Sequence, residues 1–379
     1  MEKPFLPPGD RPMVTPIVTA INYEFGSFDL LHRITEGDVE GYTYQRDDNP
    51  TCRAVERQIA AMEGGADCVI ASTGMAAITL AYLTYLNAGD HLLIFHDTYG
   101  ANYKVSLLLE KFGVEVTWLD AWDQDKAAER VHQNTRMIYC ETPSNPLVKV
   151  VDIARLREIA DGVGARLVVD NTFATPLHQR PLELGADLVV HSASKALGGH
   201  NNLMAGVVVC RTKEQYDELW FTRQAIGPCL GPFAASLLDT GLKTLDVRVP
   251  RMAENAMAIA EFLSEHPRVS RVYYPGLPSD PGHEIAARQM RDGFGGMLAF
   301  DVGETQQEAM EFVEKLRVIY HAVSLGCTET LACIPVVSTL LYLPEERRTV
   351  FGVKPNTVRL SAGTGDTQEL LDDLAQALG

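Results

Sequence analysis

Seven short apolar runs recur between residues 68 and 209, and an amphipathic stretch separates each run from the next. The spacing predicts strands at 68–71, 91–95, 114–118, 137–140, 167–169, 188–190 and 207–209. Helix-start signals stand between them: Asn49-Pro50-Thr51 precedes a predicted helix over 53–62, and Asp152 precedes one over 153–160. Strands that alternate with helices in this way predict an α/β domain with a mostly parallel, seven-stranded sheet covered on both faces.

Two segments lie outside this pattern. The first 48 residues are rich in proline, glycine and aromatic residues without a sustained period, which favours an extended arm lying on another surface. After about residue 245 the spacing loosens, with predicted strands at 269–274, 297–301 and 357–360 and helices at 249–265, 304–316 and from 368. This segment is typical of a smaller α+β domain. We therefore expect an arm (1–48), an α/β domain (49–244) and a C-terminal domain (245–379).

The charge of the chain limits its partners. Its 379 residues hold 33 Lys and Arg against 50 Asp and Glu, a net charge of −17 that opposes general affinity for nucleic acids or anionic membranes. With 46% hydrophobic residues the chain can bury a large core, which excludes a mainly disordered protein. We expect a small-molecule ligand, no nucleic acid and no membrane.

The cellular compartment follows from cysteine usage and from the apolar segments. The 7 cysteines are scattered without a C-x-x-C pair, which indicates a reducing compartment. The first residues lack the pattern of a secretory signal, and the longest apolar segment, 76–86, is too short to span a bilayer. The expected location is the cytoplasm.

Polar residues follow five of the predicted strands at the point where each strand ends. In open parallel sheets, ligands collect at the carboxyl ends of the strands. The segments concerned are 72–75, 97–100, 141–146, 170–172 and 191–195. One edge of the sheet is therefore predicted to gather hydroxyls, an aspartate, a tyrosine and a lysine.

Lys195 follows the predicted strand at 188–190, with Ser192 and Ser194 beside it. A lysine at a buried strand end can form a Schiff base, because a desolvated amine is more readily neutral and nucleophilic. The alternative is a surface lysine between two turn serines.

Asp170 ends the apolar run at 167–169. An acid at the end of a buried strand must be paired, bound to a ligand or at a cleft. Pyridoxal phosphate needs such an acid, because a carboxylate keeps its pyridine nitrogen protonated while a lysine holds its aldehyde. The alternative is that Asp170 caps a turn through Asn171 and Thr172.

The phosphate of that cofactor would require hydrogen-bond donors. Residues 72–75 precede a helical stretch whose free backbone N–H groups suit an anion, and Gly74 allows close approach. An ordinary capped helix start is the alternative. Ser192 and Ser194 could add hydroxyl donors, and Tyr99 could stack on a ring or simply be half-buried packing.

Other cofactor classes lack their motifs. The sequence has neither G-x-G-x-x-G nor a P-loop, which argues against a nucleotide-binding dehydrogenase. It also has no H-E-x-x-H and no cysteine–histidine cluster with zinc spacing, so we expect no metal site. His191, His200 and His283 are interpreted as packing or capping residues.

Eight blocks, in order, resemble the cysteine/methionine-metabolism (trans-sulfuration) family of pyridoxal-phosphate enzymes. The blocks are 42–46 with 49–51, 72–75, 99–100, 141–146, 169–176, 191–195 with 198–200, 324–326 and 358–361. The family includes cystathionine γ-lyase, cystathionine β-lyase, cystathionine γ-synthase, methionine γ-lyase and the acylhomoserine sulfhydrylases. The resemblance implies a fold-type I enzyme that binds pyridoxal 5'-phosphate in its α/β domain.

The resemblance also implies roles for the candidates around the cofactor. Lys195 is the expected Schiff-base lysine and proton carrier, Asp170 the pyridinium partner, and Tyr99 the stacking residue that helps deprotonate the incoming amine. The expected cofactor contacts are completed by Gly74, Met75, Thr172, Ser192 and Ser194.

Two further sets of residues follow from the same resemblance. Tyr44 and Arg46 resemble residues that the family lends to the phosphate of a neighbouring subunit, which implies at least a dimer with shared active sites; family members are usually tetramers. Arg359 resembles the arginine that binds the substrate α-carboxylate as a bidentate fork. Asn145 and Ser324 would assist nearby.

A few positions bear on which reaction is catalysed. Methionine γ-lyases carry a cysteine where this chain has Ala101, and cystathionine γ-lyases and γ-synthases carry a glutamate where it has Val323. Acylhomoserine sulfhydrylases commonly have asparagine in place of Ser324. Lys104 stands near the place where the cystathionine enzymes often have an arginine for the distal carboxylate.

The leading hypothesis is a carbon–sulfur lyase acting by γ-elimination on cystathionine, homocysteine or methionine. Such a reaction gives 2-oxobutanoate, ammonia and a thiol. The alternative is γ-replacement on an O-acyl-homoserine, as in cystathionine γ-synthase. A more distant alternative is a non-catalytic oligomeric protein that retains the fold.

Overall fold

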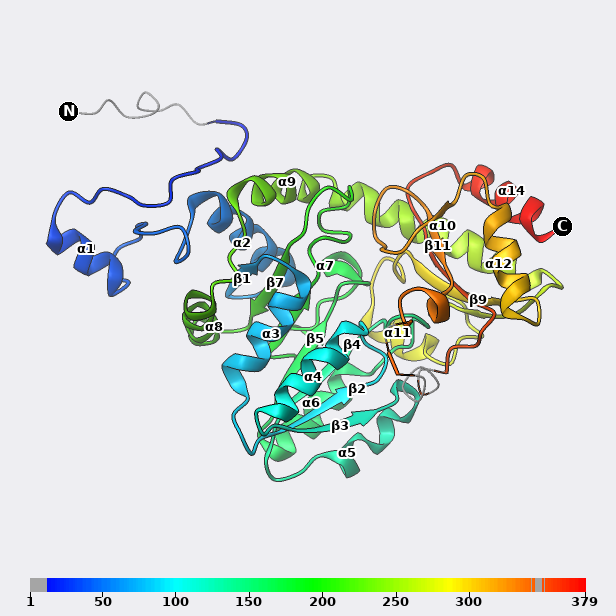
Figure 1. Cartoon of the computed structure of the whole chain (residues 1–379), viewed down its shortest axis with the longest axis horizontal. Coiled ribbons are helices and arrows are strands. Elements are labelled where there is room, and N and C mark those ends of the chain that lie inside the picture. The colour runs from blue at the N-terminus through cyan, green and yellow to red at the C-terminus, as the bar shows by residue number, and fades with distance from the viewer. Residues whose placement is uncertain (1–11, 342, 345–349, 351) are drawn as a thin grey trace.

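The computed structural model describes residues 12–341, 343–344, 350 and 352–379. Its larger sheet has seven strands in the order β1-β7-β6-β5-β4-β2-β3 (Figure 1). The strands are β1 (Asp67–Ala71), β2 (His91–Phe95), β3 (Glu115–Leu119), β4 (Thr135–Glu141), β5 (Arg166–Asp170), β6 (Leu188–His191) and β7 (Gly206–Cys210). β7 runs antiparallel to β1 and β6, and the other pairings are parallel. The predicted mostly parallel, seven-stranded sheet is confirmed.

Both faces of this sheet are covered, which explains why its strands are almost continuous apolar runs. One face packs against α3 (Gly74–Tyr85), α4 (Ala101–Lys111) and α8 (Lys213–Ile226). The other packs against α2 (Pro50–Glu63), α6 (Ile153–Val163) and α9 (Pro232–Leu242). In β5, Val168 joins the first of these cores, whereas Leu167 and Val169 join the second.

The two predicted helix starts are confirmed by their caps. The side-chain oxygen of Asn49 accepts a hydrogen bond from the amide of Thr51 at 2.9 Å, which begins α2. The carboxylate of Asp152 accepts one from the amide of Arg155 at 3.0 Å, which begins α6. Each cap satisfies a backbone donor that the first helical turn leaves unpaired.

A second sheet, β10-β11-β12-β9-β8, forms the C-terminal part of the chain. Its strands are β8 (Val269–Tyr273), β9 (Met297–Val302), β10 (Tyr320–His321), β11 (Leu331–Cys333) and β12 (Thr357–Ser361). It packs on α10 (Leu245–Glu265), α12 (Gln306–Lys315) and α14 (Thr367–Leu378). These elements match the predicted ones, although α10 begins earlier and holds Pro250 inside it. β10 and β11 were not predicted, because two or three residues are too few to show a period.

The described part of the arm, from residue 12 onward, extends away from both sheets in Figure 1. It contains a helix that the sequence did not predict, α1 (Phe28–Thr35), which has Ser27 as its N-cap and no buried residue. A single β-bridge between Asn22 and Tyr44 joins the two sides of the arm. In the described ranges, no helix of the arm or of either sheet region is long and apolar enough to cross a membrane.

Candidate active site

A pocket of about 220 Å³ lies at the carboxyl ends of the central strands, where the sequence predicted a ligand. The predicted residues that line it are Gly74, Met75, Tyr99, Asn145, Asp170, Thr172, Ser192, Ser194 and Lys195. A larger open hollow of about 730 Å³ holds none of the predicted residues. Its lining includes Arg157 and Asp187, which pair with one another at 2.6 Å. The convergence of strand-end side chains therefore makes the smaller pocket the candidate active site.

Lys195 reaches the pocket from the turn that follows β6. Its amide donates to the carbonyl of Ser192 at 3.0 Å, and its Nζ donates to the hydroxyl of Ser324 at 2.8 Å. Burial lowers the pKa of the Lys195 ammonium, and the nearby charge of Arg359 lowers it further. A neutral, nucleophilic amine is therefore easier to reach here than on an exposed lysine.

Asp170 stands at the end of β5, directly opposite Glu141 at the end of β4. Asp170 accepts hydrogen bonds from neutral donors, the amide of Thr172 at 3.0 Å and the hydroxyl of Tyr139 at 3.2 Å. Burial raises the pKa of Asp170, while the hydrogen bonds from Thr172 oppose that rise. Asp170 thus caps the turn at Thr172, which was the alternative interpretation of this residue. It also presents a buried carboxylate that suits a cationic ring N–H.

Glu141 also lines the candidate site, although the sequence analysis gave it no role. Its Oε2 accepts a hydrogen bond from the amide of Tyr99 at 2.8 Å, so it fixes the backbone that carries the Tyr99 ring. Burial, followed by the charge of Asp170, raises the pKa of Glu141 well above its usual range. Of this pair, Asp170 has more donors, so we expect it to ionise first and Glu141 to keep its proton. The strand-end rule that selected Asp170 also covers Glu141 and could have found it.

Gly74 begins α3 at the edge of the pocket. The hydroxyl of Thr73 caps this helix by accepting from the amide of Ala76 at 3.0 Å. A Cβ on Gly74 would lie 2.8 Å from Cβ of Ser192, so only glycine lets the Ser192 turn approach the helix N-terminus. This approach forms a cradle of backbone donors of the kind that binds phosphate.

Ser194 is already engaged in the structure. Its hydroxyl donates to the carbonyl of Ala205 at 3.2 Å and accepts from the amide of Ala205 at 2.9 Å. These bonds fasten the Lys195 turn to the segment before β7. Ser194 therefore holds the turn in place in addition to lining the pocket.

Arg359 enters the site from β12 of the second sheet and is 3% exposed. Its Nη1 donates to Oδ1 of Asn145 at 3.1 Å, and its Nη2 donates to the carbonyl of Ser324 at 2.9 Å. Ser324 has a positive φ of 87°, which suits few residues other than glycine and turns its carbonyl toward Arg359. Both acceptors are neutral, so the guanidinium keeps a charge that an anionic ligand can satisfy.

Tyr44 and Arg46 are not brought to this pocket. Both lie on the arm with their side chains about half exposed, at 44% and 53%. The guanidinium of Arg46 stands 5.5 Å from the centre of the Tyr44 ring. Within one chain, the structure thus gathers the other predicted residues and leaves this pair on the surface.

Three features fit pyridoxal phosphate: the low-pKa amine of Lys195, the buried carboxylate of Asp170 and the cradle at Gly74. Comparison with known proteins agrees. Residues 7–379 match the family model described as Cys/Met metabolism PLP-dependent enzyme. The chain therefore belongs to this family of pyridoxal-phosphate-dependent enzymes.

Individual relatives align over most of the chain. Cystathionine gamma-lyase of Bacillus subtilis (strain 168) is 42% identical over 343 residues, which cover 90% of each protein. Cystathionine beta-lyase of Lactococcus lactis subsp. cremoris (strain MG1363) is 43% identical over the same length and coverage. The crystal structure of cystathionine gamma synthase from Xanthomonas oryzae pv. oryzae in complex with cystathionine superposes with a TM-score of 0.91. It is 39% identical, over 96% of this chain and 92% of that one. The fold-type I architecture expected from the sequence is confirmed.

Proposed function

We propose that this enzyme cleaves the carbon–sulfur bond of cystathionine, homocysteine or methionine by γ-elimination, giving 2-oxobutanoate, ammonia and a thiol. The observation that carries the proposal is the buried guanidinium of Arg359, whose acceptors are neutral, linked through Ser324 to the amine of Lys195. An amino acid brings a carboxylate for the guanidinium and an α-proton for the amine. The two relatives that are lyases support cleavage over replacement.

Each residue has a defined task in this proposal. Pyridoxal phosphate, when bound, stabilises the negative charge that develops at the substrate α-carbon. Lys195 would hold the cofactor aldehyde and move the α-proton, while Asp170 would pair with the ring nitrogen. Tyr99 would stack on the ring and help deprotonate the substrate amine, and Arg359 would bind the α-carboxylate.

The remaining candidates support these groups. Gly74, Met75, Ser192 and Ser194 hold the phosphate, with Thr172 as a further cofactor contact. Asn145 and Ser324 assist Arg359.

We also propose that the active sites are shared between subunits of a homo-oligomer, at least a dimer and in the form usual for the family a tetramer. The exposed positions of Tyr44 and Arg46 support this arrangement, because neither reaches the pocket of its own chain.

A cytoplasmic location is supported by the free state of the seven cysteines. We also propose that the chain divides into the arm (1–48), the α/β domain (49–244) and the C-terminal domain (245–379). Each of the two larger units contains one of the two sheets.

A second reaction fits the same residues, namely γ-replacement on an O-acyl-homoserine. The structural neighbour from Xanthomonas oryzae pv. oryzae is a cystathionine gamma synthase, which favours this candidate. Removal of the α-proton and binding of the carboxylate are common to both reactions. The difference lies in whether a thiol nucleophile intercepts the substrate before 2-oxobutanoate is released.

The test is to incubate the pure enzyme with cystathionine, homocysteine, methionine and O-succinyl- or O-acetyl-homoserine, with and without cysteine. Release of 2-oxobutanoate and ammonia from a sulfur amino acid without added thiol is the expected result. Cystathionine formation from an acyl-homoserine, with no 2-oxobutanoate from any sulfur amino acid, would instead establish γ-replacement. Pyruvate in place of 2-oxobutanoate would show β-elimination.

A non-catalytic protein that retains the fold is tested separately by visible absorbance after addition of pyridoxal phosphate. We expect an absorbance band in the native protein that is absent from Lys195→Ala. A colourless native protein would favour the non-catalytic alternative.

A further inference from the structure

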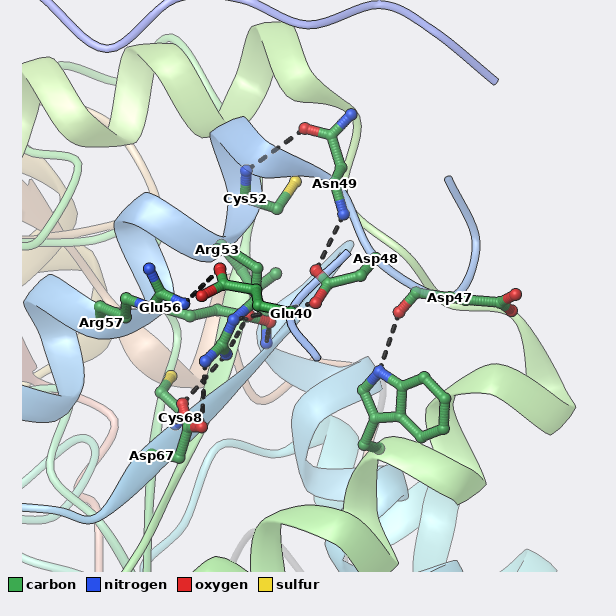
Figure 2. A network of polar contacts seen from close by, with 12 residues as sticks. Glu40, Asp47, Asp48, Asn49, Cys52, Arg53, Glu56, Arg57, Asp67 and Cys68 are labelled. Carbon is green, nitrogen blue, oxygen red and sulfur yellow. Dashed lines mark hydrogen bonds and ion pairs between the residues drawn. The ribbon is translucent and has the colours of Figure 1, made fainter. Parts of the chain in front are cut away.

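We propose that a buried ion network at the base of the arm fixes the direction in which the arm leaves the subunit and so positions Arg46 for the active site of a second copy of this chain. This arm-root network consists of Arg53, Glu56, Asp67 and Arg223, together with Trp220. Figure 2 shows Arg53, Glu56 and Asp67 side by side below Asp48. The inference rests on the proposed function, because it assumes that Arg46 serves a neighbouring subunit. It assigns a positioning role to residues that touch neither substrate nor cofactor.

Two side chains of α8 hold the same backbone oxygen of the arm. Nη2 of Arg223 donates to the carbonyl of Asp47 at 2.6 Å, and Nε1 of Trp220 donates to it at 2.9 Å. Asp47 directly follows Arg46 in the chain. Because two donors from one helix converge on that carbonyl, the peptide after Asp47 has a fixed orientation relative to the sheet.

Behind this contact, the network continues into the core. The carboxylate of Glu56 accepts from Arg223 at 2.8 Å and from Arg53 at 2.7 Å, and Glu56 is fully buried. Arg53 also donates to both oxygens of Asp67, at 3.0 Å each. These bonds join α2, β1 and α8. A buried ion network of this kind has one good geometry, since moving any member leaves a charge unpaired.

The turn that carries Arg46 is closed on itself and tied to this network. The carbonyl of Tyr44 accepts from the amides of Asp47 at 3.0 Å and Asp48 at 3.1 Å. The Asp48 carboxylate lies 3.8 Å from Nε of Arg53 (Figure 2). Residues 44–48 therefore move with the network as one unit.

An earlier segment of the arm, at Val18, is fastened at the same place. The amide and carbonyl of Val18 bond to Thr51 and Asn49 at 2.9 and 2.8 Å, at the start of α2. Between these two attachments the chain lies outside the body, and α1 buries none of its residues. The subunit thus sets the angle of the arm at the base of the arm. The outer part of the arm carries apolar side chains, such as Phe25 and Phe28, that are exposed in the single chain.

The test measures cofactor binding rather than activity. Apoprotein is titrated with pyridoxal phosphate and with pyridoxal, which lacks the phosphate, for the native chain, Trp220→Phe, Arg46→Ala and the double variant. Trp220→Phe removes the indole donor to Asp47 while keeping an aromatic ring. Arg155→Gln, which breaks an exposed ion pair with Glu158 on α6, is the control.

We expect Arg46→Ala to weaken binding of pyridoxal phosphate by about 10-fold or more and Trp220→Phe by about 3–10-fold. Neither change should alter the affinity for pyridoxal. The losses in the double variant should be less than additive, because the contact of Arg46 is already gone in Arg46→Ala and only Tyr44 is left for Trp220→Phe to displace. The control should match the native chain.

Two kinds of result would overturn the inference. Additive losses in the double variant, equal losses for both ligands, or native affinity in Trp220→Phe would exclude the positioning role while leaving the shared site intact. Unchanged affinity in Arg46→Ala would exclude both. If Trp220→Phe does not fold, Arg223→Lys repeats the test, since a lysine cannot donate to Glu56 and Asp47 with the same two-pronged geometry.

Discussion

The hydroxyl of Ser324 accepts a hydrogen bond from Nζ of Lys195 at 2.8 Å, which joins a loop of the C-terminal region to the turn after β6. The carbonyl of the same serine accepts one from Arg359. The residue that we propose moves the α-proton and the residue that we propose binds the carboxylate therefore share one neighbour. The site is complete only when the two parts of the chain are in contact.

Replacement of Arg359 by lysine should weaken substrate binding. Lysine keeps the positive charge but cannot reproduce the fork that now reaches Asn145 and Ser324. We expect kcat/KM to fall by about 10–100-fold, mainly through KM, with the affinity for pyridoxal phosphate unchanged. Steady-state kinetics and cofactor titration measure the two effects, and Arg155→Lys on α6 is the exposed control. A native KM in Arg359→Lys would contradict the assigned role.

Replacing the carboxyl by an amide should affect kcat much less at Glu141 than at its neighbour Asp170. Burial raises the pKa of Glu141 and so favours its protonated form. Glu141→Gln keeps a neutral oxygen acceptor for the amide of Tyr99 and should change kcat by no more than about 3-fold. Asp170→Asn removes the negative charge that we propose pairs with the ring nitrogen of the cofactor, and it should lower kcat by about 10²–10³-fold. Steady-state kinetics of both variants, measured under the same conditions, check this difference in kcat. Equal losses would show that the two carboxyls do not differ in charge.

Lys195→Ala, which we expect to be inactive, and Arg46→Ala, which we expect to bind pyridoxal phosphate weakly, should restore activity when mixed at a cofactor concentration that does not saturate Arg46→Ala. Lys195→Ala keeps Arg46 on its arm, whereas Arg46→Ala keeps Lys195 in its pocket. In a hybrid dimer, one of the two sites therefore contains both native residues. Random exchange of subunits should give about one quarter of the native activity. Activity is measured after co-refolding or co-expression, with each variant alone as the control. No recovery in a sample shown by mass to contain hybrids would place Arg46 outside a shared site.

The substitution Asp48→Asn should make the folded chain more stable at alkaline pH. Burial, followed by the charge of Glu56, raises the pKa of Asp48 to about 7. A folded-state pKa above the unfolded value means that folding favours the protonated form, so ionisation costs stability as pH rises from about 4 to 7. Asp48→Asn should therefore raise Tm at pH 8, and its advantage should disappear near pH 4.

Thermal unfolding across pH checks this expectation for Asp48. Asp38→Asn, at an exposed position of the arm, is the matched control and should show no pH-dependent gain. An Asp48→Asn variant that is less stable than the native chain at pH 8 would mean that the ion pair with Arg53 outweighs the cost of burial.

The sequence by itself determined the strands, the main helix starts and most of the pocket. These signals are local: a buried parallel strand is a continuous apolar run, Asn49 and Asp152 cap their own helices, and the carboxyl ends of parallel strands meet at one edge. For this reason Asp170 and Lys195 could be selected without knowing which strands are neighbours.

Only the tertiary structure decided the relationships between segments that are far apart in the chain. Strand register sets Glu141 opposite Asp170, and the packing of the two sheets sets Ser324 between Lys195 and Arg359. The carbonyl of Asp47 likewise contacts α8, which lies far along the chain. Such contacts arise from long-range packing and pairing, which leave no period or cap in the local sequence.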